Sequence, residues 1–144
     1  MSEALVLPCS SCLKLNRVPR ERLSDQPVCG QCGSRLLGQA PVNLAPSAFD
    51  RFLSRCDLPV VVDFWAAWCG PCRAMAPAFE AAAGELTGEV LLAKLDTEAA
   101  PELSARHGIQ GIPCLILFDH GREVGRMPGA TNTAGIVGWV RSQL

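Results

Sequence analysis

The pentapeptide at residues 68–72, WCGPC, constrains this chain more than any other segment. It follows the apolar run 59–65, which is typical of a buried strand, and it opens a segment in which apolar residues recur with helical spacing. Unpaired N–H groups and the dipole at a helix start favour negative charge, and so favour the reactive thiolate form of Cys69. Cys72 lies one turn further on, close enough to form a ring with Cys69. The segment therefore predicts reversible dithiol chemistry.

Alternating strand and helix patterns extend over residues 39–144. Candidate strands occupy 42–44, 60–65, 90–95, 114–118 and 123–127, and candidate helices occupy 47–56, 72–87, 98–107 and 131–144. This order predicts a three-layer α/β domain, in which helices flank a mixed sheet and the last two strands form a hairpin. The redox site is expected at the carboxyl end of the strand 60–65.

A few side chains have an expected place in this domain. Ser47 is expected to cap the first helix, and Ala134 and Leu144 are expected on the inward face of the last. His107 and His120 fall at a helix end and in a turn, so we expect both in solvent. Cys56 continues the apolar stripe of the first helix and is expected in the core.

Residues 1–38 differ in character and are expected to form a separate N-terminal domain. Two C-x-x-C pairs are separated there by sixteen residues, which fits a tetrahedral zinc site with four cysteine ligands. The expected ligands are Cys9, Cys12, Cys29 and Cys32. Because the segment has few large apolar residues, metal binding is expected to provide much of its folding free energy. Four thiolates leave no open position for water, which predicts one structural Zn²⁺; two disulfides are the alternative.

The overall composition disfavours several classes of partner. The net charge of −1 gives no electrostatic reason to expect nucleic acid or an anionic membrane surface. No apolar stretch approaches the roughly 18–20 residues of a membrane span. The first residues show no basic leader, so we expect a cytoplasmic protein, and we expect a monomer.

Segments that carry a family resemblance occur in matching order at 61–72, 93–96, 108–113 and 129–130. They resemble the thioredoxins, and with the front cysteines the whole chain resembles the zinc-containing bacterial members of that family. The resemblance implies an enzyme that reduces protein disulfides, with Cys69 as nucleophile and Cys72 as the resolving thiol of a redox-active disulfide. It also implies an NADPH-dependent thioredoxin reductase as electron donor. The flavin belongs to that partner, because this chain shows no nucleotide-binding glycine fingerprint and needs no organic cofactor.

Asp63 lies in the middle of an apolar strand, where an ionised carboxylate is costly. Burial should raise its pKa, which suits a base that takes the proton from Cys72 during resolution. The resemblance implies the same role, with Lys94 on the neighbouring strand as the electrostatic partner. The alternative is a structural aspartate with no part in the chemistry.

The resemblance further implies a cis peptide bond before Pro113 and a flat apolar rim that binds an extended protein substrate. This rim consists of Trp68, Gly70, Pro71, Ile112, Gly129 and Ala130. Trp65 is expected to be a packing residue behind the site. Cys114 stands where thioredoxins commonly carry threonine, and it is either a small packing residue or a third thiol near the dithiol.

Three rival interpretations remain open from the sequence. The same fold could serve an oxidant or isomerase instead of a reductase. The front cysteines could make the chain a zinc-dependent redox sensor or holdase. A plain zinc-ribbon adaptor is also possible, although it leaves the dithiol unexplained.

Overall fold

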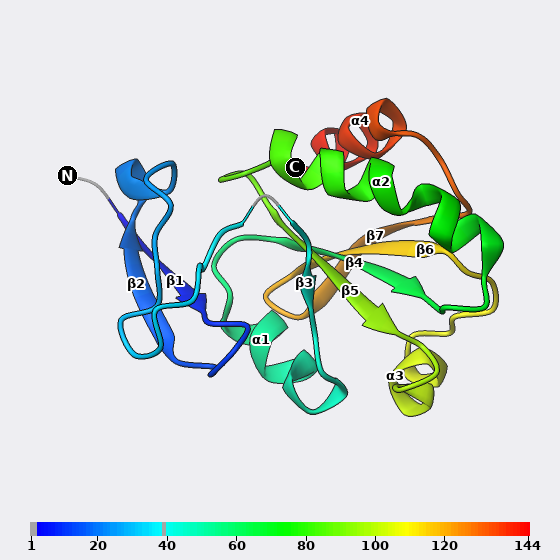
Figure 1. Ribbon diagram of the computed structural model, residues 1–144, viewed down its shortest axis with the longest axis horizontal. Coiled ribbons are helices and arrows are strands. Elements are labelled where there is room, and N and C mark those ends of the chain that lie inside the picture. Colours follow the sequence, from blue (N-terminus) through cyan, green and yellow to red (C-terminus); the bar gives the residue numbers. More distant parts are fainter. Residues whose placement is uncertain (1–2, 39) are drawn as a thin grey trace.

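The strand-forming runs assemble into two separate sheets (Figure 1). The computed structural model describes residues 3–38 and 40–144, so residues 1–2 and Gln39, at the expected domain boundary, lie outside it. Near the N-terminus β1 (Ala4–Pro8) and β2 (Leu15–Pro19) form an antiparallel pair. The larger sheet contains β3 (Val42–Asn43), β4 (Val60–Trp65), β5 (Leu91–Asp96), β6 (Cys114–Asp119) and β7 (Arg122–Pro128).

The larger sheet has the strand order β3-β5-β4-β6-β7. Strands β3 and β4 run parallel to β5, whereas β6 runs antiparallel to both β4 and β7. The central strand β4 is almost continuously apolar because both of its faces are covered, as is typical of strands in the middle of an α/β sheet.

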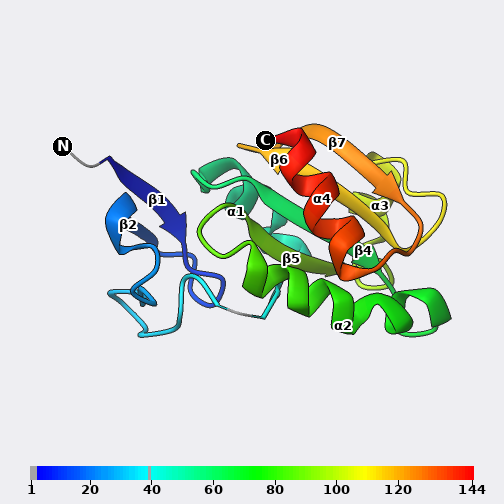
Figure 2. The same ribbon diagram turned by 90° about the horizontal axis from the view of Figure 1, so that it is seen from above.

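Helices cover the two faces of this sheet (Figures 1 and 2). They are α1 (Phe49–Arg55), α2 (Gly70–Glu85), α3 (Pro101–Arg106) and α4 (Thr133–Gln143), with 3₁₀ turns η1 (Arg20–Arg22) and η2 (Pro46–Ala48). Apolar residues of α1 and α3 pack with one face of β4, and those of α2 and α4 pack with the other. The predicted three-layer α/β architecture and its hairpin are therefore confirmed.

Some details at helix ends differ from the sequence-based expectation. Ser47 lies inside η2 and caps no helix, because Pro46 begins this turn ahead of α1. Asn132 caps α4 by accepting a hydrogen bond from the N–H of Gly135 at 2.8 Å. Ala134 and Leu144 are exposed and do not face inward. The buried residues of α4 are Ile136, Val137 and Val140.

The prediction that both histidines lie in solvent is confirmed for His120, which is exposed although it has an acidic partner, and is wrong for His107. The His107 ring packs against three phenyl rings, Phe49, Phe64 and Phe118, with centroids 5.3–6.0 Å apart, and this burial lowers its pKa. His120 lies in the turn between β6 and β7, where its Nε2 is 3.0 Å from the carboxylate of Asp57. Periodicity could not reveal either contact, because both join segments far apart in the chain.

The N-terminal ribbon, residues 3–38, docks on the larger part of the protein through apolar and polar contacts. Leu5 and Leu7 of β1 are buried in the same apolar cluster as the side chains of α1. The N–H of Val6 donates to the Asp57 carboxylate at 2.7 Å, and the N–H of Asp57 donates to the Val6 carbonyl at 2.9 Å. The ribbon therefore gains stability from a shared core as well as from any metal it holds.

The ribbon also meets the far end of α2. A cleft of about 540 Å³ lies between them, and Leu23 and Arg35 on the ribbon face Gly84 and Gly88 around the last turn of α2. The redox pentapeptide lies at the other end of this helix, so the ribbon and the dithiol are at opposite ends of the molecule (Figure 1). Among the described residues, no helix is long and apolar enough to span a membrane.

Replacing Leu7 by alanine tests whether the shared core couples the ribbon to the larger part. Leu7 has no exposed surface, so Leu7→Ala should lower the free energy of unfolding by about 2–5 kcal/mol, measured by urea denaturation. The matched control is Val124→Ala, because Val124 is 47% exposed and should change stability by less than about 0.5 kcal/mol. Equal effects of the two substitutions would contradict the shared core.

Candidate functional site

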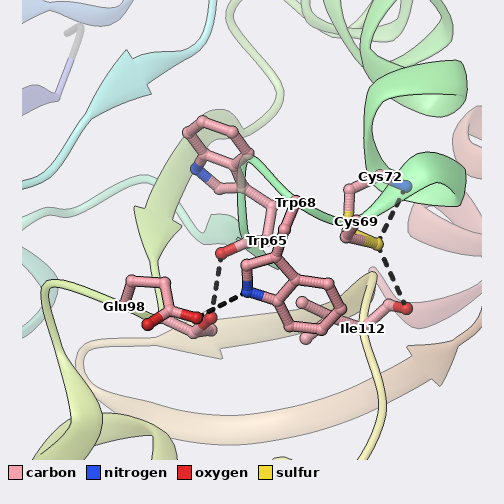
Figure 3. The surroundings of a disulfide bond; sticks show 7 residues. Trp65, Trp68, Cys69, Cys72, Glu98 and Ile112 are labelled. Atoms are coloured by element: carbon pink, nitrogen blue, oxygen red, sulfur yellow. Dashed lines mark hydrogen bonds between the residues drawn. A yellow bond between two sulfur atoms is a disulfide. The ribbon is translucent and has the colours of Figure 1, made fainter.

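Cys69 and Cys72 form a disulfide where β4 ends and α2 begins (Figure 3). Cys69 is the N-cap of α2, with an extended backbone, and its sulfur accepts a hydrogen bond from the N–H of Cys72 at 3.2 Å. Pro71 lies in the first helical turn, where its missing N–H costs nothing. The Cα atoms of the two cysteines are 5.3 Å apart, and both residues are almost completely buried. The helix begins two residues earlier than its apolar spacing indicated.

A second segment approaches the disulfide from the loop before β6. The peptide bond between Ile112 and Pro113 is cis, as the resemblance implied. The Ile112 carbonyl oxygen lies 3.6 Å from the Cys69 sulfur, and the Pro113 carbonyl accepts a hydrogen bond from the N–H of Gly129 at 2.9 Å. Three segments distant in sequence thus meet beside the redox pair.

The surface beside the disulfide is a shallow groove of about 380 Å³. Its lining includes Trp68, Gly70, Pro71 and Ile112, four of the six residues expected in the rim. Gly129 and Ala130 are exposed, and Gly129 joins this region through its bond to Pro113. Gln110 and Gly111 also line the groove, although no pattern in the sequence distinguished them as rim residues.

Trp68 is the most exposed large apolar side chain of the site, with 66% of its surface accessible. Its indole N–H donates to the carboxylate of Glu98 (Figure 3). The N–H of Glu98 in turn donates to the Asp96 carboxylate at 2.9 Å. Sequence reasoning missed Glu98, because a single acidic residue in a loop thirty positions away carries no signal of this contact.

Asp63 is the buried carboxyl group of the site, with only 1% of its surface exposed. Its Oδ1 has no hydrogen-bond partner among the described residues. Burial raises the pKa of Asp63 to about 7, and the positive charge of Lys94 opposes this shift in part. Lys94 is paired with Asp63 in the register of β4 and β5, and its ammonium lies 4.4 Å from the centre of the Trp65 ring.

The two remaining cysteines are unpaired and buried. Cys114 packs in the apolar cluster of α1 and α3, whereas α2, which carries Cys72, covers the opposite face of the sheet. Its surroundings raise its pKa, chiefly through burial. Cys56 lies in the same cluster, and burial raises its pKa to about 12. These surroundings favour the packing interpretation of Cys114 over a third redox thiol.

The four front cysteines converge on one point. Their sulfur atoms all lie within 4.8 Å of one another, with Cys9 and Cys32 at 3.5 Å and Cys12 and Cys29 at 3.6 Å. A tetrahedron of zinc–sulfur bonds has edges of about 3.8 Å, since each bond is about 2.3 Å long. The cluster therefore fits a tetrahedral metal ion.

The two loops that present these thiols have the same internal hydrogen bonds. The carbonyl of Cys9 accepts from the N–H of Leu13, and the carbonyl of Cys29 accepts from the N–H of Gly33, both at 2.9 Å. Leu13 and Gly33 both have positive φ, so the second loop has a glycine where the first holds a leucine in a strained conformation. Backbone N–H groups point at the Cys29 sulfur, and those of Cys32 and Gln31 lower its pKa to about 6.

Asn16 connects the two loops. Its side-chain oxygen accepts from the N–H of Gly30 at 3.0 Å, and its side-chain nitrogen donates to the Lys14 carbonyl at 2.9 Å. The Lys14 carbonyl also accepts from the N–H of Cys9. This residue was not predicted from the sequence, yet it orients one loop against the other as outer partners of metal ligands commonly do.

Asp63→Asn tests the buried carboxyl group through the pH dependence of stability. The folded protein holds the proton of Asp63 up to about pH 7, whereas the unfolded chain loses it near the ordinary value of 3.8. The wild-type protein therefore loses stability as the pH rises between these values, and asparagine removes this loss. From pH 5 to pH 8 the variant should gain about 2–3 kcal/mol relative to wild type in urea unfolding. Parallel curves for the two proteins would show that Asp63 does not titrate in this range.

Comparisons with known proteins agree with this arrangement. The family model of the thioredoxins matches residues 40–142, and the model described as Thioredoxin 2, N-terminal, matches residues 8–34. The chain is 44% identical to thioredoxin C-3 of Corynebacterium nephridii over 140 residues, which cover 97% of this chain and 96% of that protein.

Two further relatives match the larger part of the chain. A thioredoxin of Rickettsia felis is 32% identical over 102 residues, covering 71% of this chain and 97% of that protein. A thioredoxin of Alicyclobacillus acidocaldarius is 52% identical over 73 residues, covering 51% of this chain and 70% of that protein. With its disulfide at the start of α2 and its four clustered thiols, the chain belongs to the thioredoxin family of protein disulfide oxidoreductases and carries a zinc-ribbon domain in front.

Proposed function

We propose that this protein reduces disulfides in protein substrates, with Cys69 as the nucleophile and Cys72 as the resolving thiol. The observation that carries the proposal is the position of the Cys69 sulfur. It lies at the N-cap of α2, accepts the N–H of Cys72, and adjoins the Ile112 carbonyl at the exposed groove. A helix start stabilises a thiolate, and a thiolate is the form that attacks a disulfide.

The first step is attack of the Cys69 thiolate on one sulfur of the substrate disulfide. A bond forms between Cys69 and that sulfur, the substrate S–S bond breaks, and the other substrate sulfur leaves as a thiolate that takes a proton from water. The product of this step is a mixed disulfide. An extended substrate segment would lie in the groove beside the cis Pro113, against the rim of Trp68, Gly70, Pro71, Ile112, Gly129 and Ala130.

The second step is attack of Cys72 on the Cys69 sulfur. In our proposal Asp63 accepts the Cys72 proton, and its raised pKa near 7 suits this transfer at neutral pH. The Cys69–Cys72 bond forms, the mixed disulfide breaks, and the second substrate sulfur leaves as a thiolate that takes a proton from water, while Asp63 releases to water the proton it received from Cys72. The substrate has then gained two electrons and two protons, and the enzyme has become the disulfide seen in the structure.

Another turnover requires a reductant for the Cys69–Cys72 bond. We propose an NADPH-dependent thioredoxin reductase as this donor, a cytoplasmic location and a monomeric state, in keeping with what the family resemblance implies. We also propose a domain boundary between residues 38 and 39, which is supported by family models that match on either side of it.

For the ribbon we propose one structural Zn²⁺ held by Cys9, Cys12, Cys29 and Cys32. The spacing of their sulfur atoms supports this choice, and four thiolate ligands leave no position for a reacting group. The ion would cross-link two loops that Asn16 already joins by hydrogen bonds. Its contribution would be to folding and not to disulfide exchange.

Two cysteine variants test the order of attack. In insulin reduction with thioredoxin reductase and NADPH, Cys69→Ser and Cys72→Ser should both abolish turnover. Only Cys72→Ser should accumulate a mixed disulfide with the substrate, detected by non-reducing electrophoresis and mass spectrometry, because it retains the attacking thiol. Cys114→Ser is the matched control and should keep its turnover.

The same assay distinguishes the rival functions. A wild-type protein that is never reduced by the reductase, or that oxidises dithiols faster than it reduces insulin, would contradict the reductase proposal. Mixed disulfides that accumulate in Cys69→Ser and not in Cys72→Ser would reverse the assigned roles.

Metal analysis tests the ribbon site. Purified wild-type protein should contain one zinc per chain by inductively coupled plasma mass spectrometry, and Cys32→Ser should lose tightly bound zinc and melt at a lower temperature. Cys56→Ser removes a cysteine outside the cluster and should keep the full zinc content. Iron in place of zinc, or undiminished zinc in Cys32→Ser, would refute the assignment.

A further inference from the structure

The placement of Lys94 beside Asp63 has a feature that disulfide exchange alone does not explain. Lys94 is the positive charge that acts on the buried carboxyl group, yet no ion pair between them occurs within 4.0 Å among the described residues. The Lys94 ammonium instead lies over the Trp65 ring, 4.4 Å from its centre. The carboxyl group is left with an unpartnered Oδ1.

The register of the sheet places two possible partners, Asp63 and Trp65, near the Lys94 side chain. Asp63 is directly opposite Lys94 across the parallel pair of β4 and β5, and Trp65 is two residues further along β4. Side chains two residues apart on a strand point to the same face, so all three lie on the α2 side of the sheet. A lysine side chain is long and flexible enough to reach either the carboxyl group or the indole ring.

The indole ring competes for the ammonium by a cation–π interaction. Tryptophan is the strongest such partner among the aromatic residues, and Trp65 is half-buried, which reduces screening by water. The Trp65 ring points away from the disulfide (Figure 3), so it has no position from which to contact the reacting sulfur atoms. Its effect on the site can therefore act only through Lys94 and through packing.

We propose that Trp65 is a positioning residue that holds the Lys94 ammonium away from Asp63 and thereby keeps the proton affinity of this carboxyl group high enough to accept the proton that Cys72 loses. This inference rests on the proposed role of Asp63 and adds a residue that sets its proton affinity. Without the ring, the ammonium turns to the carboxylate and stabilises its charged form. Asp63 is then ionised too readily, and becomes a weaker base.

Other titratable groups near Asp63 do not replace Lys94 in this role. From β6, Cys114 is influenced by the charge of Asp63 but is buried with a raised pKa. From α2, Cys72 is held in the disulfide. From α4, which covers the same face, Arg141 pairs with Glu89 at 2.8 Å. Lys94 is the cation whose charge lowers the proton affinity of Asp63.

The test is a direct titration of the Asp63 carboxyl carbon by NMR in the disulfide form of the full chain. Trp65→Leu should lower the midpoint of this titration by about one pH unit, since the freed ammonium approaches the carboxylate. Trp65→Phe keeps a weaker aromatic partner and should give a smaller shift in the same direction. It also provides a folded variant for the titration if Trp65→Leu fails to fold.

The control is the same pair of substitutions in a Lys94→Met background. A wider opening to water on removal of the ring would also lower the midpoint, but it would do so with or without the ammonium. Our proposal requires the shift to disappear when Lys94 is methionine. A shift of equal size in both backgrounds, or no shift in folded Trp65→Leu and Trp65→Phe, overturns it.

This experiment is independent of the proposed reductase activity, because it uses oxidised protein without substrate or reductase. If the wild-type protein fails to reduce insulin but the Asp63 titration still shifts in a way that depends on Lys94, the proposed function is refuted and the positioning role of Trp65 is supported. Normal insulin reduction in the wild type with no such shift would refute the positioning role alone.

Discussion

The hydrogen bond from the Cys72 N–H to the Cys69 sulfur fixes the start of α2 and the geometry of the disulfide together. It can form only because β4 is buried on both faces and ends at a defined point, from which the chain turns directly into the helix. Gly70 and Pro71 occupy the first turn, where they leave the N–H of Cys72 free to reach the sulfur. The redox chemistry thus depends on the packing of a strand that contains no cysteine.

Burial has opposite consequences at the two ends of the molecule. At the dithiol it leaves one oxygen of Asp63 without a hydrogen bond and raises its proton affinity. At the ribbon it lets Leu5 and Leu7 join the apolar cluster of α1, which adds to the few apolar contacts that so small a domain can make within itself. Burial therefore lowers stability at the carboxyl group for which we propose a proton transfer, and raises it at the domain for which we propose a metal ion.

Much of the fold could be predicted, because β4, α2 and the hairpin have strong local patterns and the paired cysteines have a spacing with chemical meaning. The Asp63 environment was also predictable, since a carboxyl group in the middle of an apolar strand is carried into the core with its neighbours. Contacts between distant segments were not. The packing of His107 among phenyl rings, the Trp68–Glu98 bond and the docking of Val6 on Asp57 depend on how the elements meet in space. The orientation of Lys94 could not be predicted either, because its side chain can reach both Asp63 and Trp65.

The separation of the ribbon from the dithiol sets the minimum distance that a binding partner must span to contact both. Helix α2 has 16 residues, and a helix of this length extends about 24 Å between its two ends. An extended polypeptide needs about seven residues to cover that distance. A short disulfide peptide can therefore contact the dithiol but not the ribbon. A protein that binds both must hold its disulfide about 24 Å or more from the segment that contacts the ribbon.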